Sequence, residues 1–311
     1  MLGRAGLDFY ADPPGTRVEA ARNFVPALGG SAANIAAGIA RLGGAAALLS
    51  VVSDDAVGRF VANELACYGV GTAHTRVVSD GARTSLAVVA TRNDDTQSVI
   101  YRNGAADFEL NAVDVKAVSF ASFGGLIVTG TALAADPSRT ATFLAAERAR
   151  AAGAAVIFDV DYRPYSWTGD REAAAVYRHF AEGCDIVVGN DEEFAVMADG
   201  GDGELLARQL AEGVDAVVYK MGARGARTFA GSAVFQTDAF PVEALKPTGA
   251  GDAFLAGFAT GLALGLDLAA SVRRGAAAAA IVVTRVGCAP ASPTAAELDS
   301  FLAARAMSSS L

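Results

Sequence analysis

The sequence predicts an α/β fold in which a mostly parallel β-sheet is covered by helices on both faces. Short apolar runs of strand length alternate with longer segments of helical periodicity along most of the 311 residues. The strand-like runs are apolar at successive positions, as expected where a strand is buried on both of its faces. No linker or internal repeat divides the chain, so residues 1–311 are expected to form one domain.

The expected strands are short apolar runs that stand between helical patterns. In chain order they are residues 46–52, 126–129, 155–159, 185–188 and 216–220. The fourth shows the pattern most clearly, because Ile186, Val187 and Val188 run without a polar break into Gly189. Ligands of such sheets bind beyond the carboxyl ends of the strands, so the residues that follow each run are candidates for a site.

The expected helices have apolar residues at helical spacing. In chain order they are residues 31–43, 55–68, 138–152, 171–182, 202–212, 252–264, 268–285 and 294–305. In the helix that begins at residue 252, the side chains of Phe254, Leu255, Phe258 and Leu262 follow this spacing. Ser31 is the expected cap of the first helix, with Asn34 on its first turn.

Two segments interrupt this alternation. The first comprises residues 8–24, and the second comprises residues 84–107. Within the second, residues 84–91 and 97–102 predict a hairpin with alternating faces around Asn93-Asp94-Asp95.

Composition excludes several classes of protein. The formal net charge is −9 and no basic cluster compensates for it, which argues against nucleic-acid binding. With 52% hydrophobic residues, the chain can bury one large core. No uncharged apolar run reaches the roughly 18 residues of a membrane span. Met1–Tyr10 lacks the pattern of an export signal, so a cytoplasmic location is expected.

Cysteine and histidine residues are few and isolated. Cys67, Cys184 and Cys288 are odd in number and widely spaced, so we expect reduced thiols without metal-binding spacing. We interpret His74 and His179 as structural or surface groups.

The most informative motif comprises residues 246–254, Lys-Pro-Thr-Gly-Ala-Gly-Asp-Ala-Phe. Gly249, Ala250 and Gly251 have almost no side chain, so their backbone N–H groups can approach a ligand oxygen at the positive end of a helix. Asp252 places a carboxylate beside this anion site. The pairing suits phosphoryl transfer, in which the N–H groups stabilise the moving phosphoryl group and the carboxylate accepts a hydroxyl proton. The alternative is an ordinary glycine-rich helix start with an acidic first turn.

Two further motifs accompany it. Residues 29–44 place a Gly-Gly turn before a helix, and Asn190-Asp191-Glu192-Glu193 follows the strand-like run at residues 185–188. In order and spacing the three motifs resemble those of the ribokinase-like (PfkB) carbohydrate kinases, and the resemblance covers essentially the whole chain. It implies a three-layer α/β/α sandwich with a mostly parallel central sheet. It also implies a small β lid, formed here by residues 8–24 and 84–107.

The resemblance assigns roles to particular residues. On the sugar side it implies Asp8, Gly29, Gly30, Ser31, Asn34, Tyr101, Arg102 and Arg163, with Asp252 as catalytic base beside Gly249, Ala250 and Gly251. On the ATP side it implies Asn190, Lys220, Gly222, Gly225, Thr248, Gly249 and Gly251. Glu193 is expected to act on Mg²⁺, mostly through water. A homodimer through the lid is a further expectation.

Two arginines bear on the substrate class. Arg102 falls on an expected lid strand and Arg163 follows the carboxyl end of a strand. Because guanidinium groups bind carboxylates with two parallel hydrogen bonds, a sugar acid fits better than a neutral sugar. The surrounding segments resemble family members that phosphorylate 5-dehydro-2-deoxygluconate, with 2-dehydro-3-deoxygluconate or another sugar as alternatives. The alternative for each arginine is a surface ion pair. The alternative function, from a different class, is a non-catalytic sugar or nucleotide sensor on the same fold.

Other nucleotide-binding motifs are absent. The sequence contains neither Gly-x-x-x-x-Gly-Lys-Ser/Thr nor Gly-x-Gly-x-x-Gly, which argues against P-loop NTPases and dinucleotide-binding dehydrogenases. Residues 220–226, Lys-Met-Gly-Ala-Arg-Gly-Ala, instead resemble the loop that passes ATP in the ribokinase-like family.

Two positions depart from that family. The family's Gly-x-x-x-Asp element corresponds here to Gly3–Asp8 or Gly6–Asp8, and only Met1 and Leu2 precede it, so the first strand is expected to be mostly missing or to begin upstream. Lys246 replaces an aspartate that helps the family bind a monovalent cation, so no activation by such a cation is expected. A solvent-facing lysine is the alternative.

Overall fold

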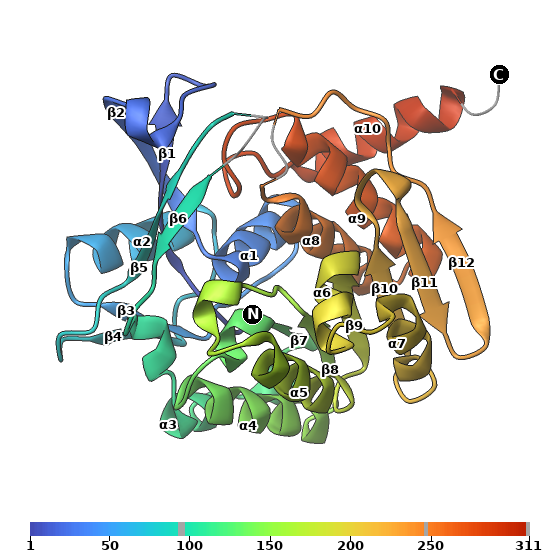
Figure 1. The fold of residues 1–311 in the computed structure, drawn as a ribbon, viewed down its shortest axis with the longest axis horizontal. Coiled ribbons are helices and arrows are strands. Elements are labelled where there is room, and N and C mark those ends of the chain that lie inside the picture. Colours follow the sequence, from blue (N-terminus) through green and yellow to red (C-terminus); the bar gives the residue numbers. More distant parts are fainter. Residues whose placement is uncertain (93–96, 246–247, 309–311) are drawn as a thin grey trace.

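The computed structural model describes residues 1–92, 97–245 and 248–308. Its largest sheet has six strands in the order β12-β11-β10-β9-β8-β7 (Figure 1). Strands β7 to β10 are parallel, whereas β11 and β12 add an antiparallel edge. The strands are β7 (Gly125–Thr129), β8 (Ala155–Asp159), β9 (Ile186–Asn190), β10 (Ala216–Lys220), β11 (Ala226–Ala230) and β12 (Ala233–Thr237).

Helices cover both faces of this sheet. The helices of the described residues are α1 (Ser31–Arg41), α2 (Ala56–Cys67), α3 (Ala112–Lys116), α4 (Ser138–Ala151), α5 (Asp170–Ala181), α6 (Asp191–Met197), α7 (Gly203–Leu210), α8 (Ala250–Ala263), α9 (Leu268–Val283) and α10 (Ala295–Ser308). Short 3₁₀ turns span Val18–Ala20, Ala106–Glu109, Phe120–Ser122, Gly130–Leu133, Pro164–Ser166 and Gly222–Arg224. All eight expected helices are present, with ends within three residues of those expected.

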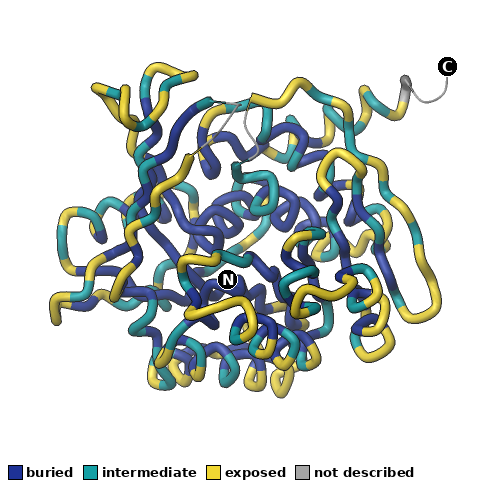
Figure 2. The backbone as a smooth tube through the Cα atoms, in the orientation of Figure 1, coloured by how far each residue is buried: buried dark blue, intermediate teal, exposed yellow. Residues whose placement is uncertain are grey.

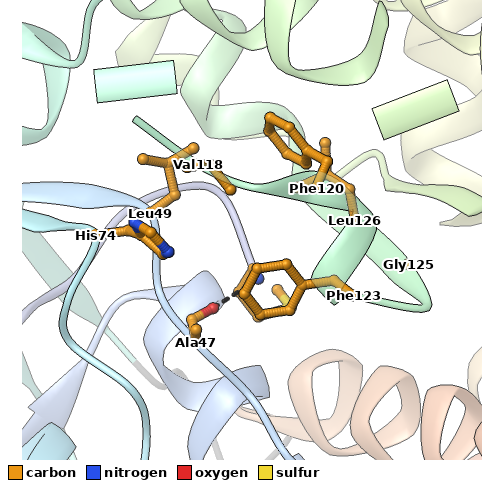
Figure 3. Close-up of a pocket in the computed structure, with 9 residues that line it drawn as sticks. Ala47, Leu49, His74, Val118, Phe120, Phe123, Gly125 and Leu126 are labelled. Carbon is orange, nitrogen blue, oxygen red and sulfur yellow. Dashed lines mark hydrogen bonds between the residues drawn. The ribbon is translucent and has the colours of Figure 1, made fainter. Parts of the chain in front are cut away.

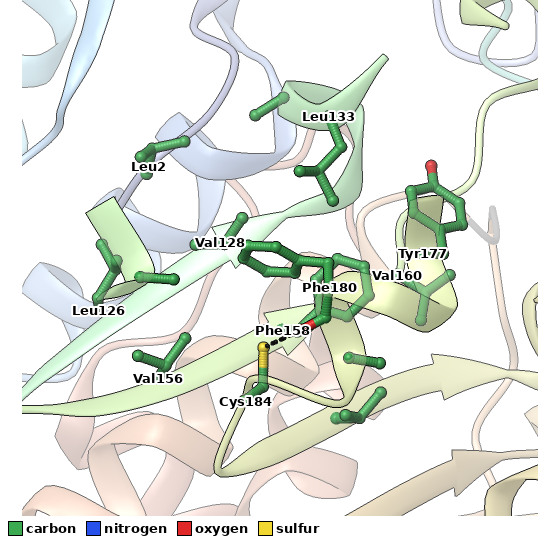
Figure 4. Close-up of a cluster of buried hydrophobic side chains, with 14 of the residues drawn as sticks. Leu2, Leu126, Val128, Leu133, Val156, Phe158, Val160, Tyr177, Phe180 and Cys184 are labelled. Atoms are coloured by element: carbon green, nitrogen blue, oxygen red, sulfur yellow. Dashed lines mark hydrogen bonds between the residues drawn. The ribbon is translucent and has the colours of Figure 1, made fainter. Parts of the chain in front are cut away.

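Alternation along the parallel strands divides the core into two layers. Ile127, Ile157 and Val188 face one side, where they pack with residues of α1, α8, α9 and α10. Val128 and Phe158 face the other side, where they pack with residues of α4, α5, α6 and α7 (Figure 4). Because both faces are buried, each strand is apolar at successive positions, as the sequence indicated.

The first strand position of the sheet is reduced to a single residue. Leu2 forms parallel bridges to Leu49 and to Val128. Its N–H group donates to the carbonyl of Ile127 at 2.8 Å, and its carbonyl accepts from Thr129 at 3.2 Å. In this way Leu2 joins the six-stranded sheet to a parallel pair, β3 (Ser50–Ser53) and β4 (Thr75–Val78). The backbone groups at this central position are therefore paired.

A second sheet of four strands lies to one side of the sandwich, in the order β2-β1-β5-β6 (Figure 1). It consists of β1 (Gly6–Asp12), β2 (Asn23–Gly29), β5 (Ser85–Val89) and β6 (Ser98–Tyr101). The expected hairpin strands are confirmed as the antiparallel pair β5 and β6, while its turn at 93–95 lies outside the described residues. The segment 8–24, expected to interrupt the alternation and to form part of the lid, contains most of β1 and the start of β2.

The distribution of burial follows these layers. Figure 2 shows buried backbone through the central sheet and the helices packed on it, with exposed backbone on the outer loops. No disulfide bond links Cys67, Cys184 and Cys288. None of the helices in the described residues combines the length and apolar character that a membrane span requires.

Candidate active site

The carboxyl ends of the parallel strands bring polar residues to one edge of the sheet. Asp159 ends β8, Asn190 ends β9 and Lys220 ends β10. Two helices begin at the same edge. The first turn of α8 lies beside Lys220, and its Asp252 accepts a hydrogen bond from Asn34 in the first turn of α1. Parallel α/β sheets bind ligands at such an edge. Residues from distant parts of the sequence therefore form one cluster.

The glycine-rich motif forms the start of α8. Gly249 is the N-cap residue and adopts left-handed backbone geometry, with φ +87°. The N–H of Ala253 donates to the carbonyl of Gly249 at 3.0 Å. The N–H groups of the first turn, at Ala250 to Asp252, precede the residues that can bond within the helix, so they are directed outward. Together with the helix dipole, they provide the predicted anion site.

Asp252 lies in this first turn with its carboxylate held by α1. The Asn34 side-chain amide donates to Asp252 Oδ2 at 2.9 Å. Burial, followed by the negative charge of Asp161, raises the pKa of Asp252 to about 7, although the Asn34 hydrogen bond and the charges of Arg163 and Arg4 act in the opposite direction. A carboxyl group with a pKa near neutrality is well matched to accept a proton from a hydroxyl group.

Asp161 occupies the centre of the cluster. Its side chain is 3% exposed and forms an ion pair with Arg163, with Oδ1 to Nη2 at 2.7 Å. The Ser31 hydroxyl donates to Oδ2, and the Thr131 hydroxyl donates to the same oxygen at 3.4 Å. Its backbone is left-handed, with φ 38°. The sequence motifs did not single out Asp161, although its position after a strand end was a usable signal.

Lys220 lies among several carboxylates. Its Nζ is 3.7 Å from Asp159 Oδ1 and would be 3.7 Å from a Cβ on Gly251. Burial alone would lower the pKa of Lys220, but nearby carboxylates, Asp159 first, raise it. Burial also raises the pKa of Asp159 well above its ordinary value. The lysine is therefore charged and lies next to the anion turn.

Asn190 and Glu193 form a reciprocal cap at the start of α6. The Asn190 side chain accepts from the Glu193 N–H at 2.8 Å, and Glu193 Oε2 accepts from the Asn190 N–H at 2.7 Å. This pairing is a capping box, so both residues have a structural role. Glu193 nevertheless stays close enough to raise the pKa of Lys220 and of Arg163.

The remaining ATP-side residues lie near the same edge. Gly222 and Gly225 lie in the turn between β10 and β11, where the Met221 N–H donates to the Gly225 carbonyl at 2.7 Å. Thr248 directly precedes the cap of α8. Lys246 lies outside the described residues, so the expectation that no monovalent cation activates the protein stays a prediction.

The four-stranded sheet supplies the other wall. Asp8 of β1 lies against Gly29 of β2, where a Cβ atom would overlap the carboxylate. At Gly30, the N-cap residue of α1, a Cβ atom would overlap the Arg4 carbonyl. The Tyr10 hydroxyl lies 3.2 Å from both Asp8 Oδ2 and Cys288 Sγ. Because Cys288 packs against Gly249, this contact connects the sheet to the anion turn.

Two predicted sugar-side residues do not direct available polar groups into this cluster. The side chain of Tyr101 shares the sheet face of Leu86, opposite that of Asp8, and is 58% exposed. Arg102 is buried in an ion pair with Asp107, whose Oδ2 accepts from Nε at 3.0 Å. Its Nη2 also donates to the Thr131 carbonyl at 2.9 Å, and its Nη1 donates to Ser166 at 3.3 Å. All three nitrogens of Arg102 are therefore engaged by the protein itself.

A small pocket elsewhere has no part in this arrangement. It lies at the amino end of β7, where Gly125 and Leu126 meet Phe120, Phe123 and His74 (Figure 3). The site edge is at the opposite, carboxyl end of the same strand. The lining is mostly apolar, and His74 contacts the ring of Phe123 edge-on, consistent with a structural histidine.

Comparisons with known proteins agree with this geometry. The family profile described as pfkB family carbohydrate kinase matches residues 1–295. The chain is similar to the 5-dehydro-2-deoxygluconokinase of Photobacterium profundum, with 39% identity covering 98% of this chain and 94% of that protein. For the 5-dehydro-2-deoxygluconokinase of Geobacillus kaustophilus, identity is 37%, covering 97% and 92%.

A solved structure shows the same fold. The chain is similar to a fructokinase with bound ATP from Xylella fastidiosa, with a TM-score of 0.87 and 27% identity over 98% of each chain. This likeness confirms the expected α/β/α architecture.

Proposed function

Since this chain belongs to the pfkB family of carbohydrate kinases, we propose that it transfers the γ-phosphoryl group of ATP to a primary hydroxyl of 5-dehydro-2-deoxygluconate. The observation that carries the proposal is Asp252, a carboxylate with a pKa near 7 beside an N–H anion turn. The names and coverage of the relatives support the choice of acid. ATP as donor is supported by the ATP bound in the similar fructokinase. We also propose a cytoplasmic location.

In the proposed mechanism, Asp252 removes the proton of the acceptor hydroxyl while its oxygen attacks the γ-phosphorus. The bond between that phosphorus and the bridging oxygen breaks, and ADP leaves with the electron pair. The N–H groups of Gly249, Ala250 and Gly251 stabilise the charge on the moving phosphoryl group. Lys220 adds a positive charge beside this turn.

The sugar acid is proposed to lie between α1, the four-stranded sheet and the loop after β8. Asn34 orients Asp252, and Ser31 and Arg163 hold Asp161. Asp8, Gly29 and Gly30 form the wall from the sheet. We retain the four-stranded sheet as a lid over this sugar and the chain as one domain.

Magnesium fits the acidic character of this edge, although within residues 1–92, 97–245 and 248–308 no three acidic, histidine or cysteine side chains converge as a metal cage. Mg²⁺ commonly keeps several waters and takes few protein ligands, which suits a single residue acting through water. We propose Glu193 for this role, with Asn190, Gly222, Gly225 and Thr248 near ATP. Bound there, the ion would neutralise phosphate charge.

Replacing Glu193 with glutamine is expected to raise the Mg²⁺ concentration needed for half-maximal activity several-fold, with little change in the KM of the sugar acid. Glutamine keeps an oxygen that can accept the Asn190 N–H, so the helix cap is preserved while the charge is lost. A Mg²⁺ titration of initial rates measures the effect. Glu192→Gln, on the same turn but exposed, is the matched control. An unchanged titration for Glu193→Gln would contradict the role.

The proposed function is tested by ATP consumption with a panel of acceptors. The panel contains 5-dehydro-2-deoxygluconate, 2-dehydro-3-deoxygluconate, ribose and fructose. We expect the first acid to give the highest kcat/KM. A higher value for another acceptor would reassign the substrate. Binding of an acceptor without any ATP consumption would instead indicate a sensor on the same fold.

We further propose a homodimer through the outer face of the four-stranded sheet. The side chains of Phe24, Val99 and Tyr101 share this face and are well exposed. Exposed apolar patches commonly mark interaction surfaces. The proposed dimer places Tyr101 at a subunit interface rather than against the sugar. The molecular mass of the protein in sedimentation tests whether the dimer forms.

A further inference from the structure

Arg4 has an unusual environment for a buried charge. It is 7% exposed, and Arg102 and Arg274 are the other arginines buried to this extent in the described residues. Arg102 is paired with Asp107, and Arg274 Nη1 lies 2.8 Å from Asp299. Within the described residues, no carboxylate lies within ion-pair distance of Arg4. Among those residues its side chain donates a single hydrogen bond, from Nη1 to the Ser85 hydroxyl at 3.2 Å.

Such an arrangement is costly in the free protein. Moving a charge from water into a protein interior is strongly unfavourable unless a partner of opposite charge offsets it. A guanidinium group has five N–H donors in a planar fork, and Ser85 accepts only one of them. The other N–H donors have no hydrogen-bond acceptor among the described residues, so they are available for an anion.

The surroundings of Arg4 belong to the proposed sugar site. The Arg4 carbonyl accepts from the Ala33 N–H at 3.3 Å, which ties the residue to the first turn of α1. Ser85 lies at the start of β5 in the four-stranded sheet. Burial raises the pKa of Asp252 and of Tyr165, and the charge of Arg4 acts in the opposite direction on both, so its guanidinium lies close to both groups. Arg4 therefore lies between the sheet and the catalytic turn.

The other arginines near the site are less available. Arg102 donates to Asp107, Thr131 and Ser166, and its guanidinium lies 4.0 Å above the ring of Phe108. Arg163 uses Nη2 for Asp161 and Nη1 for the Tyr162 carbonyl. Arg163 can bind a ligand only with those of its N–H groups that do not contact Asp161 or Tyr162.

We propose that Arg4 is the residue that recognises the carboxylate of the acceptor, through paired N–H donors, and so selects a sugar acid over a neutral sugar. The inference rests on the proposed function, because it identifies how that site reads the charge of its substrate. Arg163 contributes a second positive charge and keeps Asp161 in place.

The test compares Arg4→Gln with wild type on two acceptors, 5-dehydro-2-deoxygluconate and its primary amide. The amide preserves the shape of the acid and removes its charge. A hydrogen bond to a charged group is worth about 1.5–3 kcal/mol, so kcat/KM on the acid is expected to fall roughly 10- to 150-fold. We expect the value on the amide and the KM of ATP to change less than about 3-fold. Arg4→Lys should recover part of the loss, because an ammonium provides charge without the planar fork.

A thermal-unfolding measurement provides a readout independent of turnover. Without ligand, Arg4→Gln is expected to unfold at or above the wild-type temperature, because it removes a buried unpaired charge. The acid should stabilise wild type and lose most of that effect in the variant. Arg76→Gln is the matched control, since Arg76 is a half-buried arginine paired with Asp114 at 2.6 Å. It is expected to lower stability without changing the preference for the acid.

The outcomes separate this inference from the proposed function. If wild type phosphorylates a different sugar acid, the proposed substrate is wrong, and the same comparison with that acid and its amide decides the role of Arg4. Equal losses on acid and amide would overturn the inference while leaving the kinase intact. A selective rise in the KM of ATP would overturn it too, by placing a phosphate at Arg4. An enzyme that accepts only neutral sugars would overturn both.

Discussion

Replacing Asp252 with asparagine is expected to lower kcat by about 10²–10⁴-fold, the usual range for loss of a general base. Asparagine has nearly the same shape, and its side-chain oxygen can still accept from Asn34. It cannot take the proton of the acceptor hydroxyl. Binding of the sugar acid and of ATP is therefore expected to stay within a few-fold of wild type. Single-turnover rates and equilibrium binding, measured on the same preparations, check both parts.

The raised pKa of Asp252 gives this variant a second signature. In wild type, kcat is expected to rise with pH through about 7, as the carboxyl group loses its proton. The pH dependence of the stability has the opposite sign. Between about pH 4 and pH 7 an unfolded aspartate is ionised while the folded one keeps its proton, so the free energy of unfolding falls as pH rises.

Asp252→Asn should remove that fall. The variant is expected to be more stable than wild type at pH 8, by up to a few kcal/mol, and to match it near pH 4. Thermal unfolding at the two pH values measures the difference. A variant that is inactive but more stable at pH 8 has lost the base rather than the fold. Turnover close to wild type would contradict the assignment of the base.

The parts of the site that could be predicted from the sequence are those carried by local backbone. The Gly249–Asp252 turn required only small residues before a helical pattern, and α8 begins within two residues of the expected position. The parallel strands were predictable because burial on both faces leaves continuous apolar runs. The strands β11 and β12 were not, since as an antiparallel edge they mix polar and apolar residues.

The parts that could not be predicted depend on partners distant in sequence. Arg4 and Arg102 are both arginines next to suggestive motifs, and nothing local distinguishes them. The difference arises because Asp107 neutralises Arg102, whereas no carboxylate reaches Arg4 in the described part of the chain. Likewise, Asp161 gains its central place only when α1 brings Ser31 to the end of β8.

Replacing Gly249 with alanine is expected to lower kcat by about 10²–10³-fold, comparable with removing one donor from an oxyanion hole. Two physical effects combine at this position. Left-handed backbone geometry, here φ +87°, costs an alanine roughly 1–2 kcal/mol. A Cβ atom would also lie 2.9 Å from Cys288 Sγ, so either the turn or the loop that carries Cys288 must shift. A displacement of about 1 Å at such a site can cost 10²-fold in rate.

A matched glycine separates the two effects. Gly69, after the end of α2, has a similar φ of +78°, but a Cβ atom added there would have no heavy atom within 4 Å. Gly69→Ala should therefore lose comparable stability while keeping its activity, since only backbone strain is introduced. Removing the Sγ atom in the double variant Gly249→Ala with Cys288→Ala should recover part of the lost rate, relative to Cys288→Ala alone.

The rate and the binding of ATP should respond differently to Gly249→Ala. The N–H groups of the turn are proposed to stabilise charge that develops during transfer, so kcat should fall more than ATP affinity. Measuring kcat and the Kd of ATP in the four variants of the Gly249 and Cys288 cycle distinguishes this from a general loss of the nucleotide site. A kcat for Gly249→Ala within about 3-fold of wild type would mean that the turn tolerates displacement. The charge on the phosphoryl group would then have to be stabilised mainly by Lys220 and the metal ion rather than by the backbone of α8.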